Sequence, residues 1–296
     1  MLKPMHAYGI GKTPLREAEM LNGNRMFFKL EQHNFLGSIK ARTAYGIAGE
    51  LECPRDMPIV ESTSGNLGIA MDFFCKEIGR PFLCLLDDTV IASKRSFLEK
   101  SNINFTVVPT EPGYDPRCSR IRYAQRLMDT GSHFWVNQYD NEHGVSVHRK
   151  TTGPEIWEQT HGEITCCVCA VGSGGTIVGV GQYLKSRRKD IKIVAVEPYG
   201  STIFGTEDKL YLTAGAGYKG KPGNILRHEG YVDFTYVIDD AVSLEKCREL
   251  SRKQRLNVGV TTGMAYVAAE LFCRDKRGET VVVVSPDGAK HYNEFI

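Results

Sequence analysis

Residues 164–196 read ITCCVCAVGSGGTIVGVGQYLKSRRKDIKIVAV. The stretch holds a short apolar run, a glycine-rich turn, a segment with helical periodicity over 176–187 and a second apolar run. Short apolar runs without polar alternation are typical of parallel strands that are covered on both faces. The stretch therefore predicts a strand, a helix and a second strand of one parallel sheet.

The same alternation extends along almost the whole chain. Strands are expected at 26–30, 58–61, 82–86, 104–108, 133–136, 164–170, 191–196 and 280–284. Helices are expected at 38–51, 65–77, 92–100, 117–129, 143–160, 176–187, 244–253 and 262–273, with a short helix near Ala289. This order predicts a doubly wound α/β fold, and it allows two parallel sheets that are divided near residues 42 and 145.

Composition excludes several classes of protein. The 296 residues are 42% hydrophobic and 24% charged, which excludes a disordered, collagen-like or coiled-coil chain. The net charge of +2 is too small to indicate a nucleic-acid or membrane-surface binder. The sequence has no apolar run of about 18 residues and no apolar signal core at the N-terminus, so we expect a cytoplasmic protein.

The nine cysteines are an odd number in a chain without an export signal, which favours free thiols. Cys166 and Cys169 have a C-x-x-C spacing, but no second pair and no nearby histidines accompany them. We therefore expect buried thiols on a strand and no metal site.

The first of four strand-to-helix turns is NFLGSIKAR at 34–42. Gly37 and Ser38 predict a turn and a helix N-cap, which places Lys40 in the first helical turn. The positive end of the helix dipole lowers the pKa of an amine there and makes it a better nucleophile. The alternative is a solvated lysine at a helix start.

Three further turns carry hydroxyls or glycines. ESTSGNLG at 61–68 predicts an anion site at a helix N-terminus, or plain N-capping. GSGGT at 172–176 lets the backbone approach a phosphate closely, and the pattern favours a single phosphate monoester over a nucleotide; a tight turn is the alternative. VGVTTG at 258–263 offers a hydroxyl from Thr261 or Thr262, unless it only caps a helix.

Together these turns supply what a pyridoxal phosphate enzyme needs. The lysine forms the Schiff base, the glycine loop holds the cofactor phosphate, and the loop at 61–68 holds the amino-acid carboxylate. The cofactor then acts as an electron sink.

The chain resembles the cysteine synthase (O-acetylserine sulfhydrylase) and cystathionine β-synthase family of fold-type II pyridoxal phosphate enzymes. The resemblance rests on LEQHNFLGSIKAR (30–42), TSGNLG (63–68), QYDNEHGVSVHRKTTGPEIW (138–157), GSGGT (172–176), AVEP (195–198) and VGVTTG (258–263). It implies a fold like that of the tryptophan synthase β chain, with two doubly wound parallel-sheet domains. Residues 43–145 would form a smaller, mobile, substrate-side domain, and residues 1–42 and 146–296 a larger domain that holds the cofactor phosphate.

The resemblance also implies roles for individual residues. Lys40 is the catalytic Schiff-base lysine, Asn66 the partner of the phenolic oxygen of the cofactor, and Thr261 the hydroxyl that faces the pyridine nitrogen. The phosphate loop is formed by Gly172, Ser173, Gly174, Gly175 and Thr176. The substrate carboxylate is held by Thr63, Ser64, Gly65 and Gln138. The family implies a homodimer that acts on small amino-acid substrates.

The activity that the resemblance implies is a transferase reaction of amino-acid biosynthesis: β-replacement on O-acetylserine or O-phosphoserine through an aminoacrylate intermediate. A second hypothesis is β-replacement of O-phosphoserine by an amine nucleophile, which makes 2,3-diaminopropionate precursors of siderophores or antibiotics. The segment GSTIFG at 200–205, with Lys219 and Lys221, favours this branch. A serine or threonine dehydratase and a non-catalytic homologue that binds a partner remain as further alternatives.

Three cations, Lys219, Lys221 and Arg227, lie within nine residues of an irregular stretch. They form either a solvated basic loop or a contact for an anionic group of a substrate.

Overall fold

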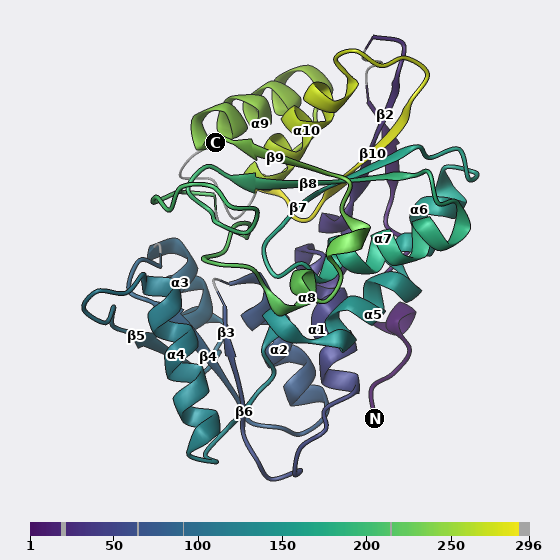
Figure 1. The fold of residues 1–296 in the computed structure, drawn as a ribbon. Coiled ribbons are helices and arrows are strands. Elements are labelled where there is room, and N and C mark those ends of the chain that lie inside the picture. Colours follow the sequence, from purple (N-terminus) through teal and green to yellow (C-terminus); the bar gives the residue numbers. More distant parts are fainter. Residues whose placement is uncertain (19–21, 64, 91, 214, 290–296) are drawn as a thin grey trace.

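The computed structural model describes residues 1–18, 22–63, 65–90, 92–213 and 215–289 (Figure 1). Two β-sheets, each flanked by helices, make up this part of the chain. None of its helices combines the length and the apolar character that crossing a membrane requires. The predicted α/β fold with parallel sheets is confirmed.

The larger sheet has the strand order β1-β2-β10-β7-β8-β9. Its strands are β1 (Leu15–Glu17), β2 (Arg25–Leu30), β7 (Cys166–Ala170), β8 (Lys192–Pro198), β9 (Phe234–Ile238) and β10 (Thr280–Ser285). Neighbouring strands pair in parallel, except that β1 runs antiparallel to β2 at the edge.

The smaller sheet has the order β5-β4-β3-β6 and is parallel throughout. Its strands are β3 (Ile59–Ser62), β4 (Phe82–Asp87), β5 (Phe105–Val108) and β6 (Phe134–Trp135). All four lie inside the segment 43–145 that is expected to form the smaller domain. The domain boundaries and the mobility of that domain stay predictions.

The helices cover both faces of each sheet, as Figure 1 shows. They are α1 (Lys40–Gly49), α2 (Asn66–Glu77), α3 (Ala92–Lys100), α4 (Pro116–Asp129), α5 (Glu142–Lys150), α6 (Thr152–Gln159), α7 (Gly175–Arg187), α8 (Gly223–Leu226), α9 (Asp240–Gln254) and α10 (Val260–Cys273). On the larger sheet, Val281 and Val283 of β10 pack toward α9 and α10, whereas Val282 and Val284 pack toward α5, α6 and α7. Both faces bury apolar side chains, so the strands need no polar alternation.

The eight strands expected from the sequence are confirmed within two residues at each end. Cys166, Cys167 and Cys169 are buried thiols on β7, as predicted. Two strands were not predicted: β1, which has only three residues and no apolar run, and β9, an edge strand whose first two residues are exposed.

Two details of the predicted helices are wrong. The segment 143–160 forms two helices instead of one, because Thr151 leaves helical geometry and Pro154 has no N–H to donate to the preceding turn. Ser38 does not cap α1; the N-cap is Ile39, without a side-chain hydrogen bond, and Ser38 is buried in a backbone bridge with Asp287. The described residues end at Ala289, so the short helix expected near this residue is not tested.

Candidate active site

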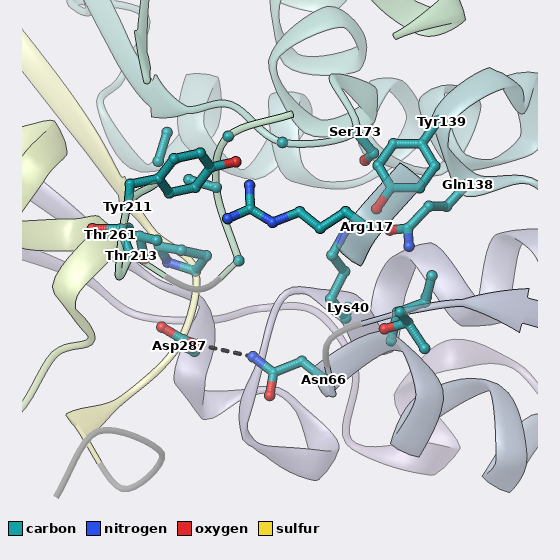
Figure 2. Close-up of a pocket in the computed structure, with 18 of the residues that line it drawn as sticks. Lys40, Asn66, Arg117, Gln138, Tyr139, Ser173, Tyr211, Thr213, Thr261 and Asp287 are labelled. Atoms are coloured by element: carbon teal, nitrogen blue, oxygen red, sulfur yellow. Dashed lines mark hydrogen bonds between the residues drawn. The ribbon is translucent and has the colours of Figure 1, made fainter. Parts of the chain in front are cut away.

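A cavity of about 420 Å³ lies where the carboxyl ends of strands from both sheets meet (Figure 2). Parallel strands bring their strand-to-helix turns to one edge of a sheet, which is where α/β folds place ligand sites. The predicted site residues that line the cavity are Lys40, Thr63, Asn66, Gln138, Gly172, Ser173, Gly174, Thr176 and Thr261. Gly65 and Gly175 are described but do not line it, and Ser64 lies outside the described residues.

Lys40 is the first residue of α1, and its amine reaches into the cavity. The Nζ atom donates a hydrogen bond to Oε1 of Gln138 at 3.0 Å. Lys40 is half-buried, and the protein around its amine displaces water, so loss of hydration lowers the pKa of Lys40 to about 8, against the raising effect of Glu61. Burial is therefore the largest cause of the lowered pKa, where the sequence argument invoked the helix dipole.

Glu61, at the end of β3, is a buried acid that the sequence analysis did not single out. Burial raises its pKa to about 7, although its Oε2 accepts a hydrogen bond of 3.1 Å from the backbone N–H of Gln138. Its signal in the sequence is an acidic residue inside an otherwise apolar strand. Lys40 and Glu61 thus titrate closer to neutral pH than an exposed lysine and glutamate do.

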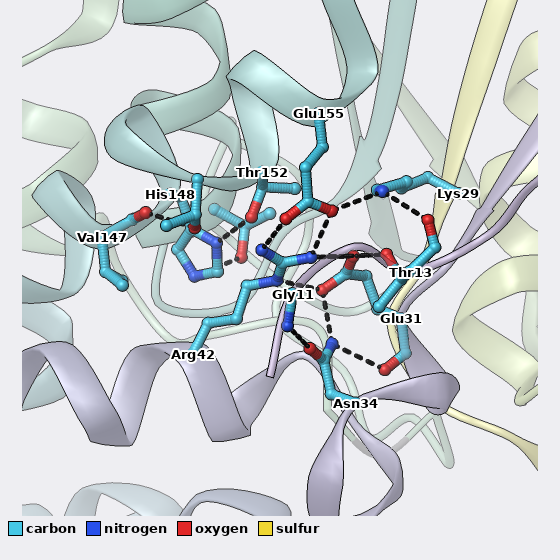
Figure 3. Close-up of polar contacts among 12 residues, drawn as sticks. Gly11, Thr13, Lys29, Glu31, Asn34, Arg42, Val147, His148, Thr152 and Glu155 are labelled. Atoms are coloured by element: carbon cyan, nitrogen blue, oxygen red, sulfur yellow. Dashed lines mark hydrogen bonds and ion pairs between the residues drawn. The ribbon is translucent and has the colours of Figure 1, made fainter. Parts of the chain in front are cut away.

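Helix α1 is fixed behind Lys40 by a buried ionic cluster around Arg42 (Figure 3). The Arg42 guanidinium donates to both carboxylate oxygens of Glu31, at 2.7 and 2.9 Å, and to both of Glu155, at 2.7 and 2.8 Å. Lys29 of β2 donates to Glu155 at 2.7 Å, to Gln159 at 2.8 Å and to the carbonyl of Thr13 at 2.8 Å. The two cations balance the two anions, and every N–H of the Lys29 ammonium has an acceptor.

The ionic cluster strongly favours the charged forms of its members. Burial alone would raise the pKa of the Glu155 carboxyl, but the hydrogen bonds and charge of Arg42, together with Lys29, lower it to about 2. Arg42 and Glu31 have completely buried side chains. Removal of one partner would therefore leave an unpaired charge in the interior.

The glycine loop 172–176 joins β7 to α7. Gly174 is the N-cap of α7 and has φ of +83°, a conformation that favours glycine. A Cβ atom on Gly174 would lie 2.7 Å from Ile225, and a Cβ on Gly172 would lie 3.1 Å from the carbonyl oxygen of Gly215. Gly172, Ser173 and Gly174 line the cavity at the start of a 13-residue helix, and a glycine-rich helix N-terminus is an arrangement that binds phosphate.

Gly175, in the same loop, allows close packing between two helices. A Cβ there would lie 3.2 Å from the carbonyl oxygen of Gly144, so this glycine permits α7 to pack closely on α5. Thr176 lines the cavity and shares a 3.4 Å hydrogen bond with the buried His148.

The two threonines at the start of α10 have different surroundings. Among the described residues the hydroxyl of Thr261 is buried without a hydrogen-bond partner, and it lines the cavity. The hydroxyl of Thr262 pairs with Ser285 at 2.9 Å. A buried polar atom without a partner is unfavourable, so Thr261 is the hydroxyl that a bound ligand would satisfy.

The loop after β3 contributes Thr63 and Asn66. Thr63 accepts a 3.2 Å hydrogen bond from the N–H of Gly65, whose φ of +144° requires glycine. Asn66 begins α2, and its Nδ2 donates to Asp287 at 2.8 Å, which leaves its second N–H and its carbonyl for other partners. Gln138 donates to the carbonyl of Ser62 at 3.1 Å while its carbonyl accepts from Lys40.

The cations expected on the irregular loop do not line the cavity. Lys219 pairs with Asp208 at 2.5 Å, Lys221 with Glu229 at 2.7 Å, and Arg227 with Glu142 at 3.1 Å, all on the surface. The segment 200–205 lies outside the cavity lining too, and its Ser201 side chain and the backbone N–H groups of residues 203 and 204 bond to the buried Glu197. The geometry thus favours the solvated-loop interpretation of these cations.

Several residues that line the cavity were not predicted from the sequence: Arg117, Arg120, Tyr139, Tyr211 and Asp287. Tyr139 lies in the quoted stretch 138–157, whereas the other four lie outside every motif and reach the cavity only because the fold brings them there. Within the described ranges no group of histidine, cysteine, aspartate or glutamate side chains is arranged to hold a metal ion.

Comparisons with known proteins agree with this geometry. The family model "Pyridoxal-phosphate dependent enzyme" matches residues 6–287. The chain is 32% identical over 294 residues to a cysteine synthase of Staphylococcus aureus, with 96% of this chain and 93% of the relative covered.

Two solved structures extend the likeness to the fold. O-Acetyl serine sulfhydrylase isoform 3 of Entamoeba histolytica has a TM-score of 0.89 at 25% identity, covering 99% of this chain and 91% of that chain. The O-acetylserine dependent cystathionine beta-synthase of Helicobacter pylori has a TM-score of 0.89 at 26% identity, covering 99% and 98%.

The ionic cluster generates a prediction about stability. Arg42→Met leaves Glu31 and Glu155 buried with Lys29 as their only cation, so we expect the free energy of unfolding to fall by about 3–5 kcal/mol. Urea titration followed by circular dichroism measures this loss. Arg25→Gln, which removes an exposed arginine that pairs with Glu163, is the control and should change stability by under about 1 kcal/mol. Equal effects of the two substitutions would contradict the assignment.

The glycine loop generates a prediction about phosphate binding. Gly174→Ala forces a side chain into the left-handed region and against Ile225, so the loop must shift. We expect the dissociation constant for pyridoxal phosphate, measured by absorbance titration, to rise at least about tenfold, the effect of losing one or more hydrogen bonds to a charged group. Gly131→Ala has the same backbone strain (φ of +70°), with no atom within 4 Å of the new Cβ, and should leave this constant unchanged. Unaltered affinity in the Gly174 variant would refute the loop's role.

Proposed function

The chain belongs to the family of pyridoxal-phosphate dependent enzymes, and from this premise we propose that it catalyses β-replacement on an O-activated L-serine. In this reaction the bond between Cβ and its oxygen breaks, the leaving group departs with the electron pair, and a nucleophile forms a new bond to Cβ. The cysteine synthase and O-acetyl serine sulfhydrylase names of its relatives support this activity. The candidate leaving groups are acetate and phosphate.

The cavity residues fit pyridoxal phosphate. The N–H groups of Gly174 and its neighbours, with the hydroxyls of Ser173 and Thr176, would hold the phosphate at the start of α7. The partnerless hydroxyl of Thr261 would face the pyridine nitrogen. Asn66 would donate to the phenolic oxygen with the amide N–H that Asp287 leaves free. The Lys40 amine would form the covalent link.

The bound cofactor supplies an electron sink for negative charge that develops at Cα of the amino acid. The chain itself supplies the proton transfer. Lys40, with a pKa of about 8, is partly neutral near pH 7, so its amine can take the α-proton and later return it to the same carbon. Gln138 holds the amine at 3.0 Å and thus fixes the position from which it acts.

The remaining residues bind and orient the amino acid. Thr63 would hold the α-carboxylate near the N-terminus of α2, and Gln138 would complete this site with its free N–H. Ser64 and Gly65 are predicted for the same site, but Ser64 lies outside the described residues and the N–H of Gly65 donates to Thr63. Thr261 carries no charge, so as the partner of the pyridine nitrogen it would favour the unprotonated form of that nitrogen. A weaker electron sink of this kind suits β-elimination and replacement better than transamination.

One observation carries the proposal most directly. The Lys40 amine, with its lowered pKa, opens onto the same cavity as the glycine loop and the unsatisfied Thr261 hydroxyl. A lysine, a phosphate cradle and a neutral hydroxyl in one enclosed space are the parts that this chemistry requires. A homodimer in the cytoplasm, which the family resemblance favours, stays a prediction.

Replacement of Lys40 tests the proposal. Lys40→Ala removes the amine that links the cofactor and moves the proton, so we expect loss of the visible absorbance of the lysine-bound cofactor and of β-replacement of O-acetylserine by sulfide. Absorbance spectra and a cysteine assay measure the two effects. Lys76→Ala, which changes an exposed lysine on α2, is the control. An unchanged spectrum in the Lys40 variant would contradict the assignment of Lys40 as the residue that links the cofactor.

The adjacent threonines provide a matched pair of variants. Thr261→Val removes the hydroxyl without a partner, so we expect turnover to fall at least about tenfold while the cofactor stays bound. Thr262→Val removes a hydroxyl that bonds Ser285, so its main effect should be on the free energy of unfolding. Steady-state kinetics and cofactor absorbance distinguish the two. A loss of turnover in the Thr262 variant alone would transfer the role to Thr262.

A further inference from the structure

Asp287 is a buried aspartate that lines the cavity beside Asn66 (Figure 2). It lies two residues after the end of β10, and only 3% of its surface is exposed. The proposed function uses Asp287 only as the acceptor of one N–H of Asn66. Its backbone and its side chain, however, contact different parts of the site, so they can decide how the cofactor-binding groups are arranged.

The backbone of Asp287 holds the segments that lead into two helices. It forms an antiparallel bridge with Ser38, just before α1, and its carbonyl accepts a hydrogen bond of 3.0 Å from the N–H of Gly259. Gly259 is the N-cap of α10. Lys40 begins α1 and Thr261 is the second residue of α10, so both are close in sequence to a residue that Asp287 holds.

The side chain of Asp287 reaches the other sheet. Asn66 is the first residue of α2, which follows β3, and its Nδ2 donates to Oδ2 of Asp287 at 2.8 Å. Strands β3 and β10 belong to different sheets, so this hydrogen bond joins the two sheets at the cavity. Asp287 is thus tied to the segments that carry Lys40, Thr261 and Asn66, which are the three groups assigned to the ring and the link of the cofactor.

The carboxylate also determines which end of the Asn66 amide it meets. An amide has a carbonyl at one end and an NH₂ group at the other, and a rotation about its last bond exchanges the two ends. An ionised carboxylate only accepts hydrogen bonds, so it selects the NH₂ end. One N–H then points to Asp287, and the second N–H of the same nitrogen stays available to a ligand, because Asn66 lines the cavity.

We propose that Asp287 is a positioning residue whose carboxylate holds the Asn66 amide with an N–H, and not the carbonyl, toward the phenolic oxygen of pyridoxal phosphate. The inference rests on the proposed function, which assigns Asn66 to that oxygen. An N–H donor stabilises the negatively charged form of the oxygen, whereas a carbonyl favours its neutral O–H form. Asp287 therefore sets the charge state of the cofactor through Asn66.

Absorbance spectra of the holoenzyme report this charge state. The lysine-bound cofactor absorbs visible light when the phenolic oxygen is charged and near-ultraviolet light when it is neutral. Asp287→Ala leaves neither end of the amide selected, so we expect the ratio of the visible to the near-ultraviolet band to fall at least about twofold, because both ends then compete for the oxygen. Asp287→Asn keeps a neutral acceptor, so its ratio should lie between those of the wild type and the alanine variant.

A double-mutant cycle separates positioning from a purely structural role. Asn66→Ala removes the amide through which Asp287 acts, so Asp287→Ala should not change the band ratio any further in that background. A structural role of Asp287 would change the ratio in both backgrounds alike. Substitution of the side chain leaves the backbone contacts to Ser38 and Gly259 in place, and the melting temperature of each variant checks that it folds.

Asp72→Ala is the matched control. Asp72 is also a buried aspartate and lies on α2, the helix that Asn66 begins, where it pairs with Lys76 at 2.7 Å. It does not line the cavity. We expect the band ratio of this variant to equal that of the wild type.

Each outcome decides the inference. An unchanged band ratio in Asp287→Ala, or an equal fall with and without the Asn66 amide, would overturn it and leave the proposed β-replacement standing. A coloured wild type that does not convert O-acetylserine and sulfide into cysteine refutes the proposed reaction instead, while the band ratios still decide the role of Asp287. A wild type that binds no pyridoxal phosphate overturns both.

Discussion

The double bidentate contact of Arg42 with Glu31 and Glu155 is the interaction on which the site depends most. It joins the chain after β2, the start of α6 and the first turns of α1, and it lies two residues after Lys40. Helix α1 also packs on α2 and α5, so its position relates the smaller sheet to the helices that cover the larger one. A fixed α1 therefore fixes the Lys40 amine relative to the loops that follow β3 and β7.

The cavity combines groups that neither sheet could supply alone. The larger sheet contributes the glycine loop after β7 and, through α10, the Thr261 hydroxyl, while the smaller sheet contributes the loop after β3 that leads to Asn66. Lys40 lies between them, buried enough for its pKa to fall to about 8. Helix α4 adds Arg117 and Arg120 to the lining of the same cavity.

The sequence predicts those parts of the site that are encoded locally. The GSGGT turn is a strand end, a glycine and a helix start, and the structure has all three. The Lys40 turn has the glycine and the helix start, but the strand before it ends at Leu30, and two short 3-10 helices, Glu31–His33 and Phe35–Gly37, lie between them. Arg117, Glu61 and Asp287 could not be predicted in this way, because their surroundings come from residues far along the chain. Ser38 could not be predicted correctly for the same reason. Its local sequence indicates a helix cap, but in the structure its backbone forms a bridge with that of Asp287. Lys219 and Lys221 were candidates for a substrate contact only because of their charge. In the structure each forms an ion pair with a nearby carboxylate.

The central claim is that Lys40 is the residue that carries the cofactor. Borohydride reduction of the holoenzyme converts the link between cofactor and lysine into a stable carbon–nitrogen bond, which survives proteolysis. Mass spectrometry of the peptides then locates the added group directly. The account predicts that the group is found on the peptide containing Lys40 and on no other lysine. Labelling of a different lysine, or none after reduction of the coloured protein, would contradict it.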